Sequence, residues 1–164
     1  MLRMGKLTDY GIVLMSYLAQ KTELQHSAHT LADAVRVPLP TVKKVLKSLS
    51  SAGLLKSERG ATGGYSLSRH ANDISVAEII TAIEGPIALT ECVSDESHCE
   101  QETHCAIQTN WTRINNAVFH ALDEVKLSDM LVPPSKTAQV SPIHFYPLNS
   151  NVGLKTLNEG ELNG

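Results

Sequence analysis

The residues of this chain best suited to chemistry are its three cysteines, which all lie in one short segment. They follow the spacing Cys92-x6-Cys99-x5-Cys105, so fourteen consecutive positions hold every thiol of the 164 residues. An odd, clustered set of thiols does not build a disulfide framework and favours metal binding or redox chemistry in a reducing compartment. Iron prefers soft thiolate ligands, and a loop of this length can fold three of them around one cluster. The spacing therefore predicts an iron–sulfur cluster site.

Two other interpretations of the cysteine segment stay open. Structural zinc sites usually pair cysteines about two to four residues apart, and the segment has no such pair. Three free thiols in a surface loop are the other alternative. Three cysteines also leave one coordination position unfilled, for which His98, His104, water or a thiol from outside the chain are candidates.

Enzymatic chemistry is not indicated by the rest of the sequence. A thiol oxidoreductase would call for a close cysteine pair, and the chain also shows no paired-carboxylate site, phosphate-binding loop or Ser-His-Asp set. A metal or cluster carrier remains an alternative, in which case the basic surface described below would be incidental. We therefore expect a binding protein and not an enzyme.

The charge of the chain is divided by position. Residues 1–70 hold ten Lys or Arg against four Asp or Glu, a balance of +6, whereas residues 71–164 hold four against thirteen, a balance of −9. These balances give the net charge of −3. A basic front half on an acidic chain indicates a module that binds a polyanion.

The basic half has the periodicity of a helix-turn-helix. Apolar residues at helical spacing from Tyr10 to Leu18 predict a first helix, with Thr8 or Asp9 as its N-cap. Thr30 is the expected cap of a short helix, 31–35, that ends before Pro38. A third helix, beginning near 38–41 and ending at Gly53, directs one apolar stripe to the core: Val42, Val45, Leu46 and Leu49.

The opposite face of the third helix is polar and basic. Side chains of these types reach phosphates and base edges when a helix lies in a major groove. The sequence then continues with two short strands, 54–59 and 65–67, around a glycine-rich hairpin tip that predicts a wing. Arg59 at the edge of the wing is suited to an adjacent minor groove. The predicted DNA-binding residues are Thr41, Lys43, Lys44, Lys47, Ser48, Arg59, Gly60 and Tyr65.

The segment Arg59-Gly-Ala-Thr-Gly-Gly-Tyr65 resembles the wing of the iron–sulfur transcription regulators typified by IscR and NsrR. The resemblance covers about residues 1–131 and includes Leu46-x-x-Leu49, Ala52-Gly-Leu-Leu55, Val76-x-Glu78-Ile-Ile80 and the three cysteines. It implies a homodimeric repressor or activator whose cluster state sets its affinity for DNA. Within the family the chain looks most similar to regulators of iron–sulfur assembly operons of the SUF type.

The resemblance also bears on the fourth ligand. IscR-like members use a histidine three residues after the last cysteine, where this chain has Gln108. NsrR-like members use an aspartate near the N-terminus of the other subunit, and Asp9 lies at the matching place. The resemblance thus implies either a two-iron (2Fe–2S) or a four-iron (4Fe–4S) cluster, with Asp9 in trans as the favoured ligand and His104, His98 or Gln108 as alternatives.

A long amphipathic helix follows the cysteine segment. Its apolar residues recur at alternating spacings of three and four, as in a coiled-coil seam, and predict a homodimer: Ile107, Trp111, Ile114, Val118, Leu122 and Val125. From 132 onward, prolines and small polar residues predict a mostly disordered tail. The chain has no run of about 18 apolar residues and no signal-peptide pattern, so we expect a cytoplasmic protein without a membrane partner.

These patterns predict a mainly α fold with a small β-wing. The expected parts are a winged helix-turn-helix domain (1–70), a linking helix (71–91), the cysteine loop (92–106), a dimerisation helix (107–131) and the tail (132–164). The predicted function is a repressor that binds double-stranded DNA and controls iron–sulfur assembly genes. A nitric-oxide or redox-sensing repressor of the same family is the alternative, because iron supply, cluster supply, oxidants and nitric oxide all act on iron–thiolate chemistry.

Overall fold

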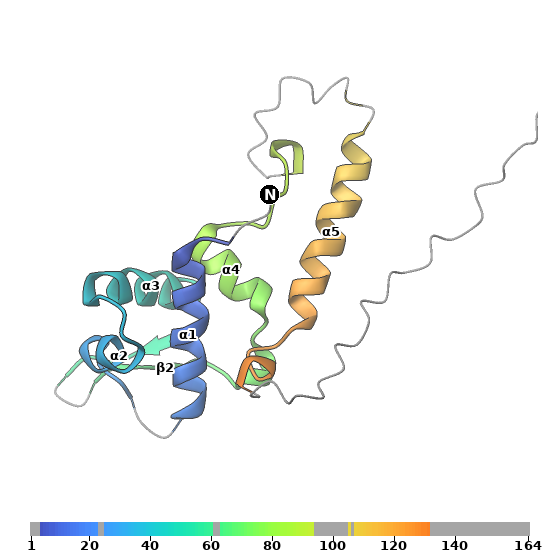
Figure 1. Cartoon of the computed structure of the whole chain (residues 1–164). Helices are drawn as coiled ribbons and strands as arrows, with labels where there is room; N and C mark the ends of the chain where they lie inside the picture. The colour runs from blue at the N-terminus through green and yellow to red at the C-terminus, as the bar shows by residue number, and fades with distance from the viewer. Residues whose placement is uncertain (1–3, 23–24, 61–62, 94–104, 106, 132–164) are drawn as a thin grey trace, which may run out of the picture. The chain divides into compact units, whose positions relative to one another are not determined.

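A computed structural model of the chain describes residues 4–22, 25–60, 63–93, 105 and 107–131 (Figure 1). Its helices are α1 (Lys6–Gln20), α2 (Ala28–Val35), α3 (Leu39–Ser51), α4 (Val76–Glu84) and α5 (Gln108–Glu124). Strands β1 (Leu55–Ser57) and β2 (Tyr65–Leu67) form one antiparallel pair. Short 3-10 turns lie at Ala71–Asp73 (η1), Glu91–Val93 (η2) and Asp129–Leu131 (η4). This arrangement confirms the predicted mainly α fold with a small β-wing.

The hydrophobic core lies where α1, α2, α3 and α4 meet. Helix α3 contributes the predicted stripe, since Val42, Val45, Leu46 and Leu49 are all buried. Helix α1 faces this stripe with buried residues of its own, among them Leu14, Met15 and Leu18. Each fully buried side chain of this size contributes about 1.5–3 kcal/mol through the hydrophobic effect. This packing fixes the orientation of α3 and leaves its basic face outward.

The start of α1 differs from the prediction. The helix begins at Lys6 with Gly5 as its N-cap, so neither Thr8 nor Asp9 is the cap. Gly5 supplies no side-chain hydrogen bond to the first turn. The polar contact comes instead from α4, where Glu84 accepts a hydrogen bond from the hydroxyl of Thr8. A carboxylate near a helix N-terminus is favourable because the helix dipole is positive there, and the sequence near α1 contains no sign of this partner.

Helix α2 also begins earlier than expected. Its N-cap is Ser27, whose side chain accepts a hydrogen bond from the amide of Thr30 at 3.1 Å, so Thr30 is not the cap. The helix ends at Val35, and its C-cap, Arg36, adopts the left-handed conformation with φ 55°. A side chain disfavours this conformation by about 1–2 kcal/mol relative to the right-handed region. Arg36 thus makes the sharp turn between α2 and α3 that a glycine would make at lower cost.

The wing is held to the rest of the domain by backbone contacts. In β1 and β2, Leu55 pairs with Leu67 and Ser57 with Tyr65. Tyr65 also exchanges two backbone hydrogen bonds with His26, of 3.1 and 2.9 Å. We expected the hairpin glycines to serve positive φ angles, and Gly60 does so with φ 122°. Gly64 has another role: a Cβ there would lie 2.7 Å from the carbonyl oxygen of His26, so only glycine permits this approach.

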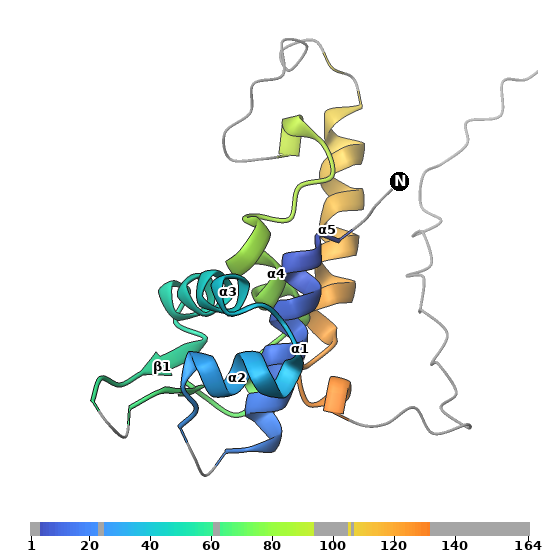
Figure 2. The same ribbon diagram turned by 60° about the vertical axis from the view of Figure 1, so that its left-hand side comes forward.

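The chain after α5 returns to the winged domain. The predicted helix over 107–131 ends at Glu124, because Val125 accepts a backbone hydrogen bond from Val76 at 2.9 Å and the chain becomes extended. Lys126 then forms a bridge with Ser75, and the fully buried Leu127 joins the core. The base of α5 is therefore fixed to the domain (Figure 2).

The predicted tail, 132–164, lies outside the described residues. Within the described ranges, no helix is both long enough and apolar enough to span a lipid bilayer.

Candidate nucleic-acid interface and cysteine segment

The exposed face of α3 gathers the predicted DNA-binding residues. Lys43, Lys44 and Lys47 are exposed, and Thr41 and Ser48 beside them are half-buried. Within the described part of the chain, no carboxylate lies within 4.0 Å of the three ammonium groups. Lysines without carboxylate partners keep their full charge available to phosphates, so this face is suited to a polyanion.

The wing adds Arg59 and Gly60, which are both exposed beside the hairpin tip. Tyr65, the third predicted wing residue, differs from them. It is half-buried, packs against the core and holds His26 through its backbone. Its structural role is therefore to anchor the wing, and its contact with DNA stays a prediction.

The cysteine segment is described only at its two ends. Cys92 lies in the turn η2, with no description of its side chain, and Cys105 is half-buried, outside any disulfide, just before α5. Gln108 begins α5, and its amide donates to the carbonyl of Cys105 at 3.4 Å. The predicted ligands outside the described residues are His98, Cys99 and His104. Among the described residues, no three His, Cys, Asp or Glu side chains gather as a metal site.

At the C-terminal end of the cysteine segment, the chemistry of the described donor, Cys105, fits an iron–sulfur cluster. Cys105 is half-buried and free of a disulfide, as a thiolate ligand must be. Asp9 is exposed in the first turn of α1 and thus free to meet a group from outside its own chain. Asp9 and Cys105 are on different elements, and among the residues that the structure describes they belong to no group of three candidate ligands.

Two residues that our sequence analysis missed form hydrogen bonds that fix the elements next to the cysteine segment. Glu84, at the end of α4, contacts the turn of α1 that carries Asp9 through its hydrogen bond with Thr8. Asn115, on α5, binds the linker before Cys92: its amide nitrogen donates to the carbonyl of Ile87 at 2.9 Å, and its amide oxygen accepts from the N–H of Leu89 at 3.0 Å. An Asn in the polar part of an amphipathic helix gives no local signal of such a role.

Comparison with known proteins gives a consistent family. The family model described as "Rrf2: Iron-dependent Transcriptional regulator" matches residues 4–133. The HTH-type transcriptional regulator CymR of Bacillus subtilis is 34% identical over 122 residues, which cover 74% of this chain and 83% of that protein. The HTH-type transcriptional regulator IscR of Aliivibrio salmonicida is 29% identical over 155 residues, covering 92% and 91%.

Solved structures agree with these relatives. The structure of B. subtilis CymR, called a global cysteine regulator, has a TM-score of 0.62 and 33% identity over 80% of this chain and 97% of that one. The structure of T. potens IscR has a TM-score of 0.58 and 28% identity over 79% and 86%. The winged helix-turn-helix fold is thus shared with transcriptional regulators.

Asn115 provides a test of how the linker is held. We expect Asn115→Ala to lower the free energy of unfolding by about 1–3 kcal/mol, because two hydrogen bonds are lost and two half-buried backbone groups are left unpaired. Amide hydrogen exchange at Leu89, followed by NMR, should become faster. Asn116→Ala is the matched control, since Asn116 is exposed on the same helix. Equal effects of the two substitutions on stability and on Leu89 exchange would contradict the role of Asn115.

Proposed function

Because this chain belongs to the Rrf2 family of transcriptional regulators, we propose that it is a repressor whose affinity for operator DNA is set by an iron–sulfur cluster bound at the cysteine segment. Like its relatives, the chain is a DNA-binding transcriptional regulator and not an enzyme. The observation that carries the proposal is the exposed basic face of α3, backed by its buried stripe. A regulator of bacterial promoters works in the cytoplasm, which we propose as its compartment.

The geometry of α3 and the wing supports DNA as the ligand. Helix α3 is the second helix of a helix-turn-helix, the element that enters the major groove in this motif. The ammonium groups of Lys43, Lys44 and Lys47 would neutralise phosphates. The hydroxyl groups of Thr41 and Ser48 would form hydrogen bonds with base edges. Arg59 would reach the neighbouring minor groove from the wing.

The donor set supports the cluster. Cys92, Cys99 and Cys105 would hold it, with Asp9 of the partner subunit as the fourth ligand and His104, His98 or Gln108 as alternatives. When bound, such a cluster supplies an iron–sulfide centre that responds to iron supply, oxidants and nitric oxide. The description of the matching family as iron-dependent agrees with this chemistry. The resemblance to SUF-type regulators favours iron–sulfur assembly genes as the target, and a nitric-oxide or redox-sensing repressor is the alternative.

A homodimer is supported by apolar surface that one chain leaves uncovered. No described residue of α5 is buried, and its seam residues Ile107 and Ile114 are 55% and 46% exposed. Helix α1 adds Val13, which is 41% exposed. Exposed apolar residues along a helical seam mark a protein–protein contact, and a second copy of α5 is complementary to the first.

The DNA-binding proposal predicts the effect of removing single charges. Lys43→Ala, Lys44→Ala and Arg59→Ala should each weaken operator binding, and each lost phosphate contact should reduce the slope of log K against log salt by about one. Fluorescence anisotropy with labelled operator at several salt concentrations measures both quantities. If all three variants keep the affinity and slope of the parent protein, the interface lies elsewhere.

The cluster proposal predicts the colour and composition of the protein. Protein purified without oxygen should be brown and contain acid-labile sulfide, and replacement of Cys92, Cys99 or Cys105 by Ala should bleach it, because each thiolate is a ligand. Stoichiometric zinc without sulfide would instead indicate the zinc alternative.

The fourth ligand is identified by matched variants of the same protein. Asp9→Asn keeps the size of the side chain and should alter the cluster spectrum and shorten its lifetime, while Gln108→Ala should leave both unchanged. If Asp9→Asn keeps the cluster spectrum and lifetime of the parent protein while His104→Ala loses the cluster, the fourth ligand is His104 and not Asp9.

The dimer proposal predicts the mass in solution. The full chain should sediment as a dimer, and Ile114→Glu should give a monomer with unchanged far-UV circular dichroism, because Ile114 makes no part of the core of its own chain. Asn116→Glu, off the seam on the same helix, is the control. A parent protein with the mass of one chain would exclude the dimer.

A further inference from the structure

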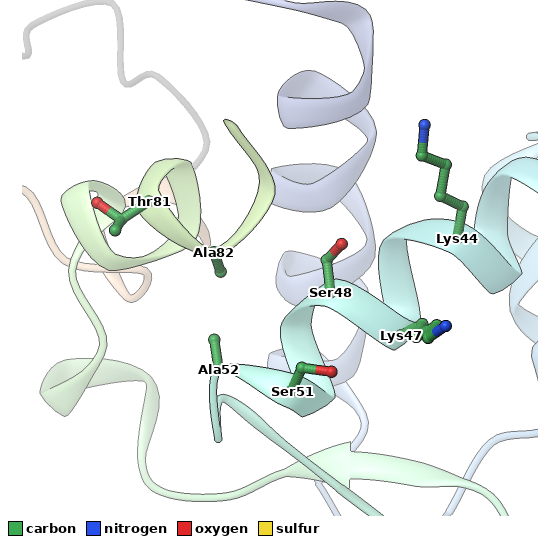
Figure 3. Close-up of a pocket in the computed structure, with 7 residues that line it drawn as sticks. All are labelled: Lys44, Lys47, Ser48, Ser51, Ala52, Thr81 and Ala82. Carbon is green, nitrogen blue, oxygen red and sulfur yellow. The ribbon is translucent and has the colours of Figure 1, made fainter. Parts of the chain in front are cut away.

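A groove lies between the recognition helix α3 and the linking helix α4 (Figure 3). Its volume is about 570 Å³, and it is open to solvent. Helix α3 and its C-cap contribute Lys44, Lys47, Ser48, Ser51 and Ala52, and α4 contributes Thr81 and Ala82. We call this surface the α3–α4 groove.

Small side chains keep the α3–α4 groove open. Figure 3 shows the methyl groups of Ala52, at the C-cap of α3, and Ala82, on α4, directed toward each other. Longer side chains at either position would fill the space between α3 and α4. The groove can therefore admit a compact group without any movement of the core.

The lining of the groove offers hydrogen-bond donors and positive charge. Two lysines and three hydroxyl residues line it, and none of its lining residues is acidic. Within the described part of the chain, the hydroxyls of Ser48, Ser51 and Thr81 have no hydrogen-bond partner, whereas that of Thr112 on α5 is bonded to the carbonyl of Gln108. In Figure 3 the hydroxyls of Ser51 and Thr81 point away from each other, so both contact one ligand after rotation of these unbonded side chains.

The two carboxylates of α4 have partners outside the groove. Glu78 forms an ion pair with Arg69 and accepts the amide of Ser75 in a capping box. Glu84 accepts the hydroxyl of Thr8. Among the described residues, neither carboxylate forms an ion pair with Lys44 or Lys47, so both lysines keep their charge for a ligand.

We propose that the α3–α4 groove binds a backbone phosphate of the operator, with Lys47 and Ser51 from α3 and Thr81 from α4 as its contacts. A phosphodiester accepts hydrogen bonds from ammonium and hydroxyl groups and is attracted by the two lysines. Because the groove is open and lies along the flank of the recognition helix, it fits one group of an extended polymer. The DNA interface then includes α4 in addition to α3 and the wing. This inference rests on the proposed DNA-binding function.

Thr81→Glu is the variant that tests the groove, because Thr81 is exposed and outside the core. The new carboxylate should weaken binding about tenfold, the size expected when a hydrogen bond to a charged group is lost. The loss should be equal for operator and unrelated DNA, since phosphate contacts carry no sequence information. The slope of log K against log salt should fall by about one. Thr81→Val, which removes only the hydroxyl, should give a smaller loss in the same direction.

The control is Asn116→Glu, which adds the same charge on the exposed face of α5. If Thr81→Glu and Asn116→Glu have the same affinity and salt slope, the groove does not bind DNA. Lys43 is not part of the groove lining. If Lys43→Ala weakens DNA binding and Thr81→Glu does not, the groove proposal is wrong while the DNA-binding function still stands. If Lys43→Ala, Lys44→Ala and Arg59→Ala are also unaffected, the proposed interface as a whole is wrong.

A titration with inorganic phosphate alone separates the two sources of a phosphate group. Saturable shifts of the Thr81 and Ser51 amide signals in NMR, together with unchanged DNA binding by Thr81→Glu, would identify a site for free phosphate. That result would overturn the assignment to the DNA backbone.

Discussion

The arrangement of this chain depends on the packing of α1 across α4. Helix α1 contacts α2, α3, β2 and α4, so it joins the helix-turn-helix to the segment that leads to the cysteines. At the crossing, Gly11 leaves room for the end of the Ile83 side chain of α4, which would have to move if position 11 carried a Cβ. Leu14 of α1 and Ile79 of α4 are both fully buried in the core. Any rearrangement of α4 must therefore act on α1, and through α1 on the core behind the recognition helix.

Two polar contacts extend this packing toward the cysteine segment. Glu84 ties the end of α4 to the first turn of α1, and Asn115 ties the linker before Cys92 to α5. Both are formed by side chains that reach across to another element. A coupling free energy of about 1–3 kcal/mol changes an affinity by about five- to 150-fold, which is the size of one or two such hydrogen bonds. The contacts are thus of a magnitude that can carry a regulatory signal.

Helix α5 is fixed to its own domain at its base and contacts α4 and η2, but it leaves part of its apolar seam exposed. Leu127 and the bridge between Ser75 and Lys126 hold its base. Ile107 and Ile114 are exposed and are not covered by their own chain. In a dimer with such a geometry, a rigid base would transmit the relative position of two α5 helices to two winged domains. In the proposed dimer, the spacing of the paired recognition helices would set which half-sites they fit, and the attachment at Leu127 would help to fix that spacing.

The sequence alone determined the order and type of the elements, because these depend on neighbours within one or two turns. The period of Val42, Val45, Leu46 and Leu49 predicted both the buried stripe of α3 and its outward basic face. The strands of the wing followed from their flanking glycines. The fold class was therefore predictable in full.

Tertiary structure decided the features whose partners lie far apart in the chain. The turn of α1 receives a carboxylate 76 residues away, and Asn115 binds a carbonyl 28 residues before it, so no local pattern could indicate either. For the same reason Thr8 and Asp9 were wrongly predicted as caps. The helix predicted over 107–131 ends earlier, at Glu124. Gly64 was assigned to turn geometry, but the close approach of the His26 backbone is what requires a glycine there. Periodicity reports which face of a helix is apolar, but only the packed chain decides which distant group meets that face.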